Sequence, residues 1–208
     1  MTRLRVLLLG PPRFMRDEVP VAELVSLKAQ ALLIHLACTD RPVSRPALAA
    51  LLWGEMPEEA ARANLRQILT KLRKAVADCL VIEGNNAVAL HAGECWCDAV
   101  AFARALEGGA EASPEGIRAA LALYRGHFLE GFHLDDAPEF EAWASAQRER
   151  LRGLAVGGWR ALARCAGDGT QAMAALRQAL RLEPWNEEAH RELMEALARA
   201  ASARRASP

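Results

Sequence analysis

Residues 60–77, AARANLRQILTKLRKAVA, constrain the fold more than any other stretch of the chain. At about 100° per residue, the large apolar side chains of this stretch fall on one narrow stripe, which is typical of a helix buried along one face. The stripe consists of Leu65, Ile68, Leu69, Leu72 and Val76. The sequence therefore predicts a helix over 60–77 that packs against the rest of a domain.

The opposite face of this helix is basic and carries no acid. Solvent-exposed helices usually intersperse Glu or Asp, which form i,i+4 pairs with basic residues. Here the basic residues are Arg62, Arg66, Lys71, Arg73 and Lys74, and the polar residues among them are Asn64, Gln67 and Thr70. Cations can hold phosphates, and amides or hydroxyls can read base edges in a major groove. Taken alone, the helix fits either nucleic-acid recognition or an ordinary amphipathic helix with a basic outer face.

The neighbouring segments favour a winged helix-turn-helix. Before the helix, the patterns predict strands over 4–9, 13–15 and 19–21 and helices over 28–38 and 45–52. After it, two β-rich runs at 80–82 and 87–90, separated by Gly and Asn, predict a hairpin. A winged helix-turn-helix needs this order, because the wing must lie beside the recognition helix.

The C-terminal half is predicted to be almost entirely helical. A short strand at 95–97 could pair with the N-terminal sheet, and helices are expected over 98–107, 113–124, 138–165 (as one long helix or two), 170–182 and 187–201. Residues 172–198 have small and large apolar residues at helical spacing on either side of Leu-Glu-Pro-Trp-Asn, which is typical of a tetratricopeptide-type hairpin or of generic helical packing. The fold class predicted is an α+β winged helix-turn-helix domain over 1–93, followed by an all-α tetratricopeptide-like domain over 94–208.

Charge and composition narrow the function further. Residues 1–93 hold twelve basic and nine acidic residues, whereas the rest hold fourteen basic and seventeen acidic, so the basic excess lies with the basic helix. No signal peptide or membrane-spanning run is found, and the five scattered cysteines indicate free thiols in a cytoplasmic protein. Neither the histidines nor the cysteines have metal-ligand spacing, and no cofactor is expected.

An enzyme is the class that the sequence supports least. It contains no nucleophile elbow, no phosphate-cradling glycine loop and no Ser/His/Asp constellation. Asp135 and Asp136 are adjacent carboxylates, but they lie on a loop where a solvated turn explains them. We therefore expect no catalysis.

Two sets of short motifs match a known family. Residues 42–45, 51–53, 61–67 (with RANLRQ) and 72–73 resemble the DNA-binding domain of the SARP family of bacterial activators, the antibiotic regulatory proteins, which is an OmpR-type winged helix. Residues 122–126 (ALYRG), 128–131 (FLEG) and 139–143 (EFEAW) resemble the bacterial transcriptional activator domain, a helical, tetratricopeptide-like module that follows the winged helix in this family. The resemblance covers nearly the whole chain.

The resemblance implies promoter binding and activation of transcription, usually as a dimer on direct repeats of double-stranded DNA, with contacts to RNA polymerase. It makes residues 60–77 the recognition helix. Combined with the helical pattern, it gives as candidate DNA contacts Asn64, Arg66, Gln67, Thr70, Lys71 and Lys74, with Arg62 and Arg73 as phosphate contacts on the flanks and Arg45 as a backbone contact from the preceding helix.

Two features depart from the family pattern. The chain ends soon after Ala200, without the usual final helices or a further domain, so we expect either a minimal member or a fragment. The wing, residues 83–89, is poor in Lys and Arg, which indicates a weak hold on the minor groove. The alternative function is a helical-repeat scaffold that binds peptides or subunits through its acidic C-terminal half, with a winged helix that does not bind DNA.

Overall fold

The computed structural model describes residues 4–39, 41–76, 79–83, 86–91, 93–108 and 113–206. Its contacts divide the chain into two compact units. Unit 1 comprises residues 1–101 and 125–148, and unit 2 comprises residues 102–124 and 149–208. Part of the C-terminal half of the chain therefore belongs to the same compact unit as the N-terminal elements.

The first sheet of unit 1 has four strands in the order β3-β2-β1-β7. These are β1 (Leu4–Leu7), β2 (Arg13–Arg16), β3 (Val19–Pro20) and β7 (Cys95–Cys97). The turn between β2 and β3 is tight, because Asp17 and Glu18 adopt positive φ angles of 49° and 63°. Strand β7 pairs in parallel with β1, with Leu4 opposite Cys95, so the expected pairing of this strand with the N-terminal sheet is confirmed.

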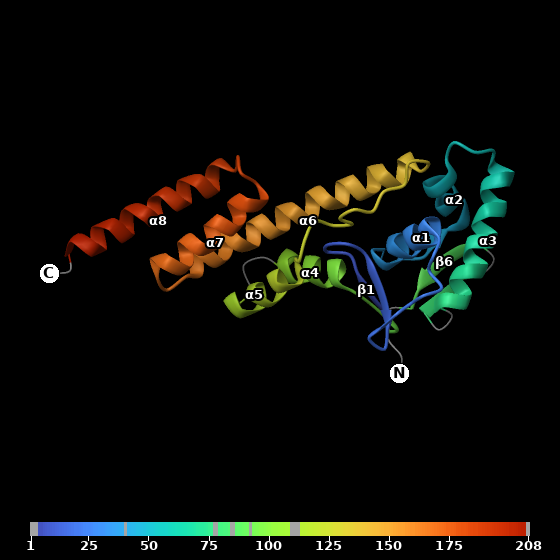
Figure 1. Cartoon of the computed structure of the whole chain (residues 1–208), viewed down its shortest axis with the longest axis horizontal. Helices are drawn as coiled ribbons and strands as arrows, with labels where there is room; N and C mark the ends of the chain where they lie inside the picture. The colour runs from blue at the N-terminus through green and yellow to red at the C-terminus, as the bar shows by residue number, and fades with distance from the viewer. Residues whose placement is uncertain are drawn as a thin grey trace. The chain divides into compact units, whose positions relative to one another are not determined.

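Three helices of unit 1 come between β3 and β7 in the chain (Figure 1): α1 (Leu27–Ala37), α2 (Arg45–Trp53) and α3 (Glu58–Val76). Ser44 caps α2, because its hydroxyl accepts the N–H of Ala47 at 3.3 Å. Leu32, Leu48 and Leu72, one from each helix, have no solvent exposure. The predicted apolar stripe of α3 is buried throughout, which confirms the amphipathic reading of this helix. Ala77, the predicted last residue of the helix, lies outside the described residues.

Helix α3 begins two residues earlier than the sequence pattern predicted. Pro57 precedes the helix, and its carbonyl accepts the N–H of Ala61 at 3.0 Å. Glu58 and Glu59 therefore occupy the first turn, where the positive end of the helix dipole favours acids. The expectation that this helix carries no acid is wrong for its first turn.

A second sheet contains the predicted hairpin. Strands β5 (Leu80–Glu83) and β6 (Ala87–Leu90) pair antiparallel, with Ile82 opposite Val88. Gly84 and Asn85, which we expected in the turn, lie outside the described residues. A short strand that the sequence did not predict, β4 (Val43–Ser44), pairs with the other side of β6. This strand links the start of α2 to the hairpin.

Residues 125–148 complete unit 1. Backbone hydrogen bonds join this segment to the residues that follow β1, from the N–H of Leu129 to the carbonyl of Leu8 at 2.9 Å and from the N–H of Gly10 to the carbonyl of His127 at 3.0 Å. Asp98 is buried beside them and accepts the N–H of Leu8 at 2.7 Å and the guanidinium of Arg125 at 2.8 Å. Burial raises the pKa of this carboxyl, although these donors and the N–H of Leu9 oppose the shift.

Unit 2 is helical, as predicted. It holds most of α4 (Asp98–Glu107), α5 (Pro114–Leu123), the second part of α6 (Pro138–Cys165), α7 (Gly169–Leu182) and α8 (Glu187–Ala206). Asn186 caps α8, because its side chain accepts the N–H of Ala189 at 2.9 Å. Helices α7 and α8 form the predicted hairpin (Figure 1), in which Ala179 and Ala189 are fully buried and permit close packing. Across the described residues, no helix is both long and apolar enough to span a bilayer.

Candidate nucleic-acid interface

The outward face of α3 is solvent-exposed along most of its length. The exposed members of the predicted set on this helix are Arg62, Arg66, Gln67, Thr70, Lys71, Arg73 and Lys74. Asn64 is half-buried, and so is Arg45 on α2. The helix therefore brings eight of the nine predicted contact residues onto one element, and α2 contributes the ninth.

Four of these cations are not neutralised within the described part of the chain. Arg66, Lys71, Arg73 and Lys74 form no ion pair with any described residue. Arg62 differs, because its guanidinium pairs with the carboxylate of Glu58 one turn earlier. A row of exposed cations without internal partners keeps its charge and its hydrogen-bond donors for an external anion.

The polar residues of α3 differ in whether their side chains already form hydrogen bonds within the protein. The Asn64 amide donates to the sulfur of Met56 at 3.5 Å, which turns it toward the preceding loop. The Thr70 hydroxyl donates to the carbonyl of Arg66 at 2.9 Å, so its oxygen keeps its acceptor capacity. Gln67 is exposed and is the amide best placed to reach a ligand.

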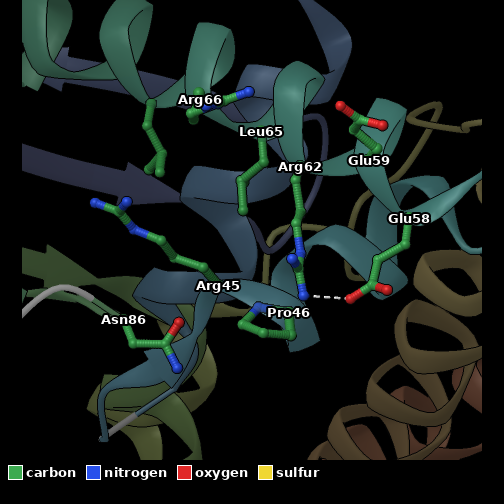
Figure 2. A pocket seen from close by; sticks show the side chains of 9 residues that line it. Arg45, Pro46, Glu58, Glu59, Arg62, Leu65, Arg66 and Asn86 are labelled. Carbon is green, nitrogen blue, oxygen red and sulfur yellow. Dashed lines mark hydrogen bonds and ion pairs between the residues drawn. The ribbon is translucent and has the colours of Figure 1, made fainter.

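A groove of about 780 Å³ lies beside the N-terminal half of α3 (Figure 2). Helix α2 contributes Arg45 and Pro46, α3 contributes Arg62 and Arg66, and the hairpin contributes Asn86. The backbone N–H of Arg45 donates to the backbone carbonyl of Asn86 at 2.8 Å, so the start of α2 is joined to the hairpin. In Figure 2 the Arg62 guanidinium turns toward Glu58, whereas Arg45 extends away from that pair.

The Arg45 guanidinium has an unused donor. Its Nε atom is buried and has no hydrogen-bond partner among the described residues. Burying such a donor costs free energy unless a ligand completes the bond. The groove therefore has three arginines at its walls, and one of them holds an unsatisfied N–H.

Two acids, Glu58 and Glu59, also line this groove. The sequence pattern placed them in an acidic loop next to the positive end of the helix, but the structure places them within its first turn. The signal was present, because a proline followed by two acids is a common helix start and Glu58 lies four residues before Arg62. Because Glu58 pairs with Arg62, the exposed cations of α3 without an ion-pair partner among the described residues begin at Arg66.

Comparisons with known proteins agree with this architecture. The family model of the bacterial transcriptional activator domain matches residues 96–206. Among solved structures, EmbR of Mycobacterium tuberculosis, in complex with a low-affinity phosphopeptide, is similar, with a TM-score of 0.71 and 26% sequence identity. The match covers 94% of this chain but 55% of the EmbR chain, so this chain spans about half of that protein's length. No curated protein matches this sequence.

The order of the parts agrees with these comparisons. A small β-rich region with a helix-turn-helix comes first, and the helical activator domain follows, as in the EmbR structure. The predicted fold class and the predicted family are thereby confirmed. This chain belongs to the bacterial transcriptional activator domain family and shares the SARP-type architecture of a winged helix followed by that domain.

Proposed function

We propose that this protein binds double-stranded DNA sequence-specifically and activates transcription. The observation that carries the proposal is the exposed face of α3, where Arg66, Lys71, Arg73 and Lys74 have no ion-pair partner among the described residues. The helix follows α2 across a short turn, as a recognition helix does, and it is flanked by a hairpin. In this proposal α3 lies in the major groove.

The residues of this face divide into two roles. Lys71, Arg73 and Lys74 have long flexible side chains and hold phosphates, which supplies affinity without sequence information. Gln67 lies nearer the helix N-terminus, the part that a helix-turn-helix presents to base edges. The Arg45 guanidinium contacts a backbone phosphate at the edge of the groove, and Arg66 and Thr70 lie between the two sets.

The finer assignments come from the family. We propose that residues 1–93 form the DNA-binding part and that residues 94–208 form the activator part, which contacts RNA polymerase in the cytoplasm. Binding as a homodimer on promoter direct repeats belongs to the same proposal. The described strands of the wing offer no Lys or Arg, so we assign the wing a minor share of the affinity.

The test is a mobility shift on mixed-sequence duplex DNA over a series of salt concentrations. If α3 neutralises phosphates, the logarithm of the association constant falls linearly with the logarithm of the salt concentration, with a slope of about −0.9 for each phosphate contacted. Four or five contacts would give a slope near −4. A scaffold whose winged helix does not bind DNA would show no retarded band at low salt, and this result would overturn the proposal.

A further inference from the structure

Lys28, the second residue of α1, carries a mostly buried ammonium that contacts three oxygen atoms. Its ammonium lies 2.6 Å from the carbonyl oxygen of Leu52, 3.1 Å from the carbonyl oxygen of Asp136 and 2.9 Å from Oδ1 of Asp136. The ammonium donates hydrogen bonds to the two carbonyl oxygens and forms an ion pair with the Asp136 carboxylate. The Lys28 side chain is 14% exposed, whereas the side chain of Asp136 is mostly exposed.

One of these acceptors belongs to the end of α2. Helix α2 ends at Trp53, and the Leu52 carbonyl is one of the last four, which lack intrahelical partners. The last turn of α2 has no basic residue of its own, so Lys28 supplies the cation that favours a helix C-terminus. Its ammonium also lies 5.5 Å from the centre of the Trp53 ring, within range of a cation–π interaction.

The turn after α2 also lies close to residues that follow Asp136 in the chain. A Cβ atom on Gly54 would lie 2.8 Å from the carbonyl oxygen of Ala50 and 3.6 Å from Cγ of Glu139. The turn that leads from α2 to α3 therefore packs against the first turn of α6, three residues after Asp136. Both contacts lie within unit 1.

We propose that Lys28 is a positioning residue for DNA binding, which ties the end of α2 to residues 136–139. The proposal rests on the function proposed above. Residues 136–139 lie in the part of the chain matched by the activator-domain model, so this domain sets the placement of the turn from which α3 starts. A recognition element must be held within about half an ångström to act, and the Lys28 contacts hold the end of the helix before it. The DNA-binding unit then extends beyond residues 1–93.

The experiment uses the full chain and a duplex selected from a random pool. Lys28→Met keeps the side-chain length but removes the ammonium, and we expect its DNA affinity to fall by about fivefold or more when measured well below its melting temperature. The salt slope should not change, because Lys28 contacts no phosphate in this proposal. Lys28→Arg, which keeps a cation, should lose less.

Two neighbouring acids provide a matched pair. Asp136→Asn weakens the acceptor of Lys28, whereas Asp135→Asn removes a carboxylate that is exposed and contacts His133 instead. We expect a loss of about twofold for Asp136→Asn and none for Asp135→Asn. If Lys28→Met fails to fold, this pair decides: equal affinities for the two variants would overturn the proposal.

A second measurement separates this proposal from the function it rests on. The Met56 N–H donates to the carbonyl of Trp53 at 3.0 Å and reports on the turn without DNA. Its hydrogen exchange should become several-fold faster in Lys28→Met and Asp136→Asn but not in Asp135→Asn. Unchanged exchange, wild-type affinity of folded Lys28→Met, or a salt slope lowered by about 1 would each overturn the positioning role. An unaltered chain that binds no DNA, with the exchange pattern intact, would contradict only the proposed function.

Discussion

The arginines of α6 in unit 2 and the cations of α3 in unit 1 use the same chemistry in opposite ways. Arg160 is 16% exposed and donates to both oxygens of Glu192, at 3.0 and 3.2 Å, and it also pairs with Glu188. Arg164 shares Glu192 at 3.4 Å. On α3 the cations after Arg62 are exposed and have no ion-pair partner among the described residues.

The difference shows that the surroundings of a cation, not its presence, indicate its role. A hydrogen bond to Glu192 raises the pKa of Arg160 above its ordinary value, and this bidentate pair leaves few donors for a ligand. Arg160 therefore joins α6 to α8, which is a structural role. The cations of α3 keep their donors and their charge for a partner.

The first prediction contrasts the response of the two units to acid. His35 on α1 packs its ring 4.8 Å from that of Trp143, and burial lowers its pKa from 6.5 to about 4. The folded state therefore binds fewer protons than the unfolded state between these values, so stability rises with pH there and falls on acidification. Between pH 7 and pH 4 the free energy of unfolding of unit 1 should fall by up to about 3 kcal/mol through this group.

His35→Phe, which keeps an aromatic ring against Trp143, should remove that part of the pH dependence. Chemical denaturation of both proteins at several pH values, followed by tryptophan fluorescence, measures it. The only histidine in the described part of unit 2 is His190, which is exposed, so unit 2 should not share this response. Equal acid sensitivity of the variant and the wild type would show that His35 is not the cause.

The second prediction concerns the loss of the ion pairs of Arg160. Arg160→Met leaves Glu192 half-buried beside Arg164 alone, and we expect unit 2 to lose about 2 kcal/mol of stability. DNA affinity should stay the same at a temperature where the variant is folded. Arg177→Met, an exposed change on α7, is the control and should cost less than about 0.5 kcal/mol. A marked loss of DNA affinity in folded Arg160→Met would mean that the contrast between the helices is wrong.

The third prediction concerns base reading by α3. Asn64 and Gln67 are the two amides among the candidate DNA contacts, and in the structure Gln67 is the exposed one. Gln67→Ala should relax preference at one position of the selected site by about 1 kcal/mol, the lower end of the range for an amide–adenine pair. Selection of bound sequences from a random pool with each variant measures this. Unchanged preference at every position for both Gln67→Ala and Asn64→Ala would refute base reading by these amides.

The elements with strong periodicity could be predicted from the sequence. Helix α3 is long enough for its apolar stripe to define one buried face, and the hairpin has two β-rich runs around Gly and Asn. Strand β4 has two residues, Val43 and Ser44, which is too short for any alternation to appear. The start of α3 was misplaced because the pattern of apolar residues begins only after its acidic first turn.

The contacts that complete unit 1 could not be predicted. Lys28 and Asp136 are separated by 108 residues, and a lysine near the start of a helix gives no sign of such a distant partner. The sequence also could not show which cations of α3 and α6 form ion pairs, because an i,i+4 pattern reveals only pairs within one helix. Sequence therefore gave candidates for the interface, and the structure distinguished Arg62, which is paired, from the free cations beyond it.

The central claim is that the free cations of α3 hold DNA phosphates, and the salt slope of DNA binding tests it most directly. Lys71→Ala and Lys74→Ala are compared with Arg164→Ala, which removes an exposed but paired cation from α6. We predict that each lysine variant weakens binding to all duplexes about equally and lowers the magnitude of the slope by about 1, whereas Arg164→Ala leaves both unchanged. A lysine variant that altered sequence preference and kept the wild-type slope would contradict the assignment, as would an equal effect of Arg164→Ala.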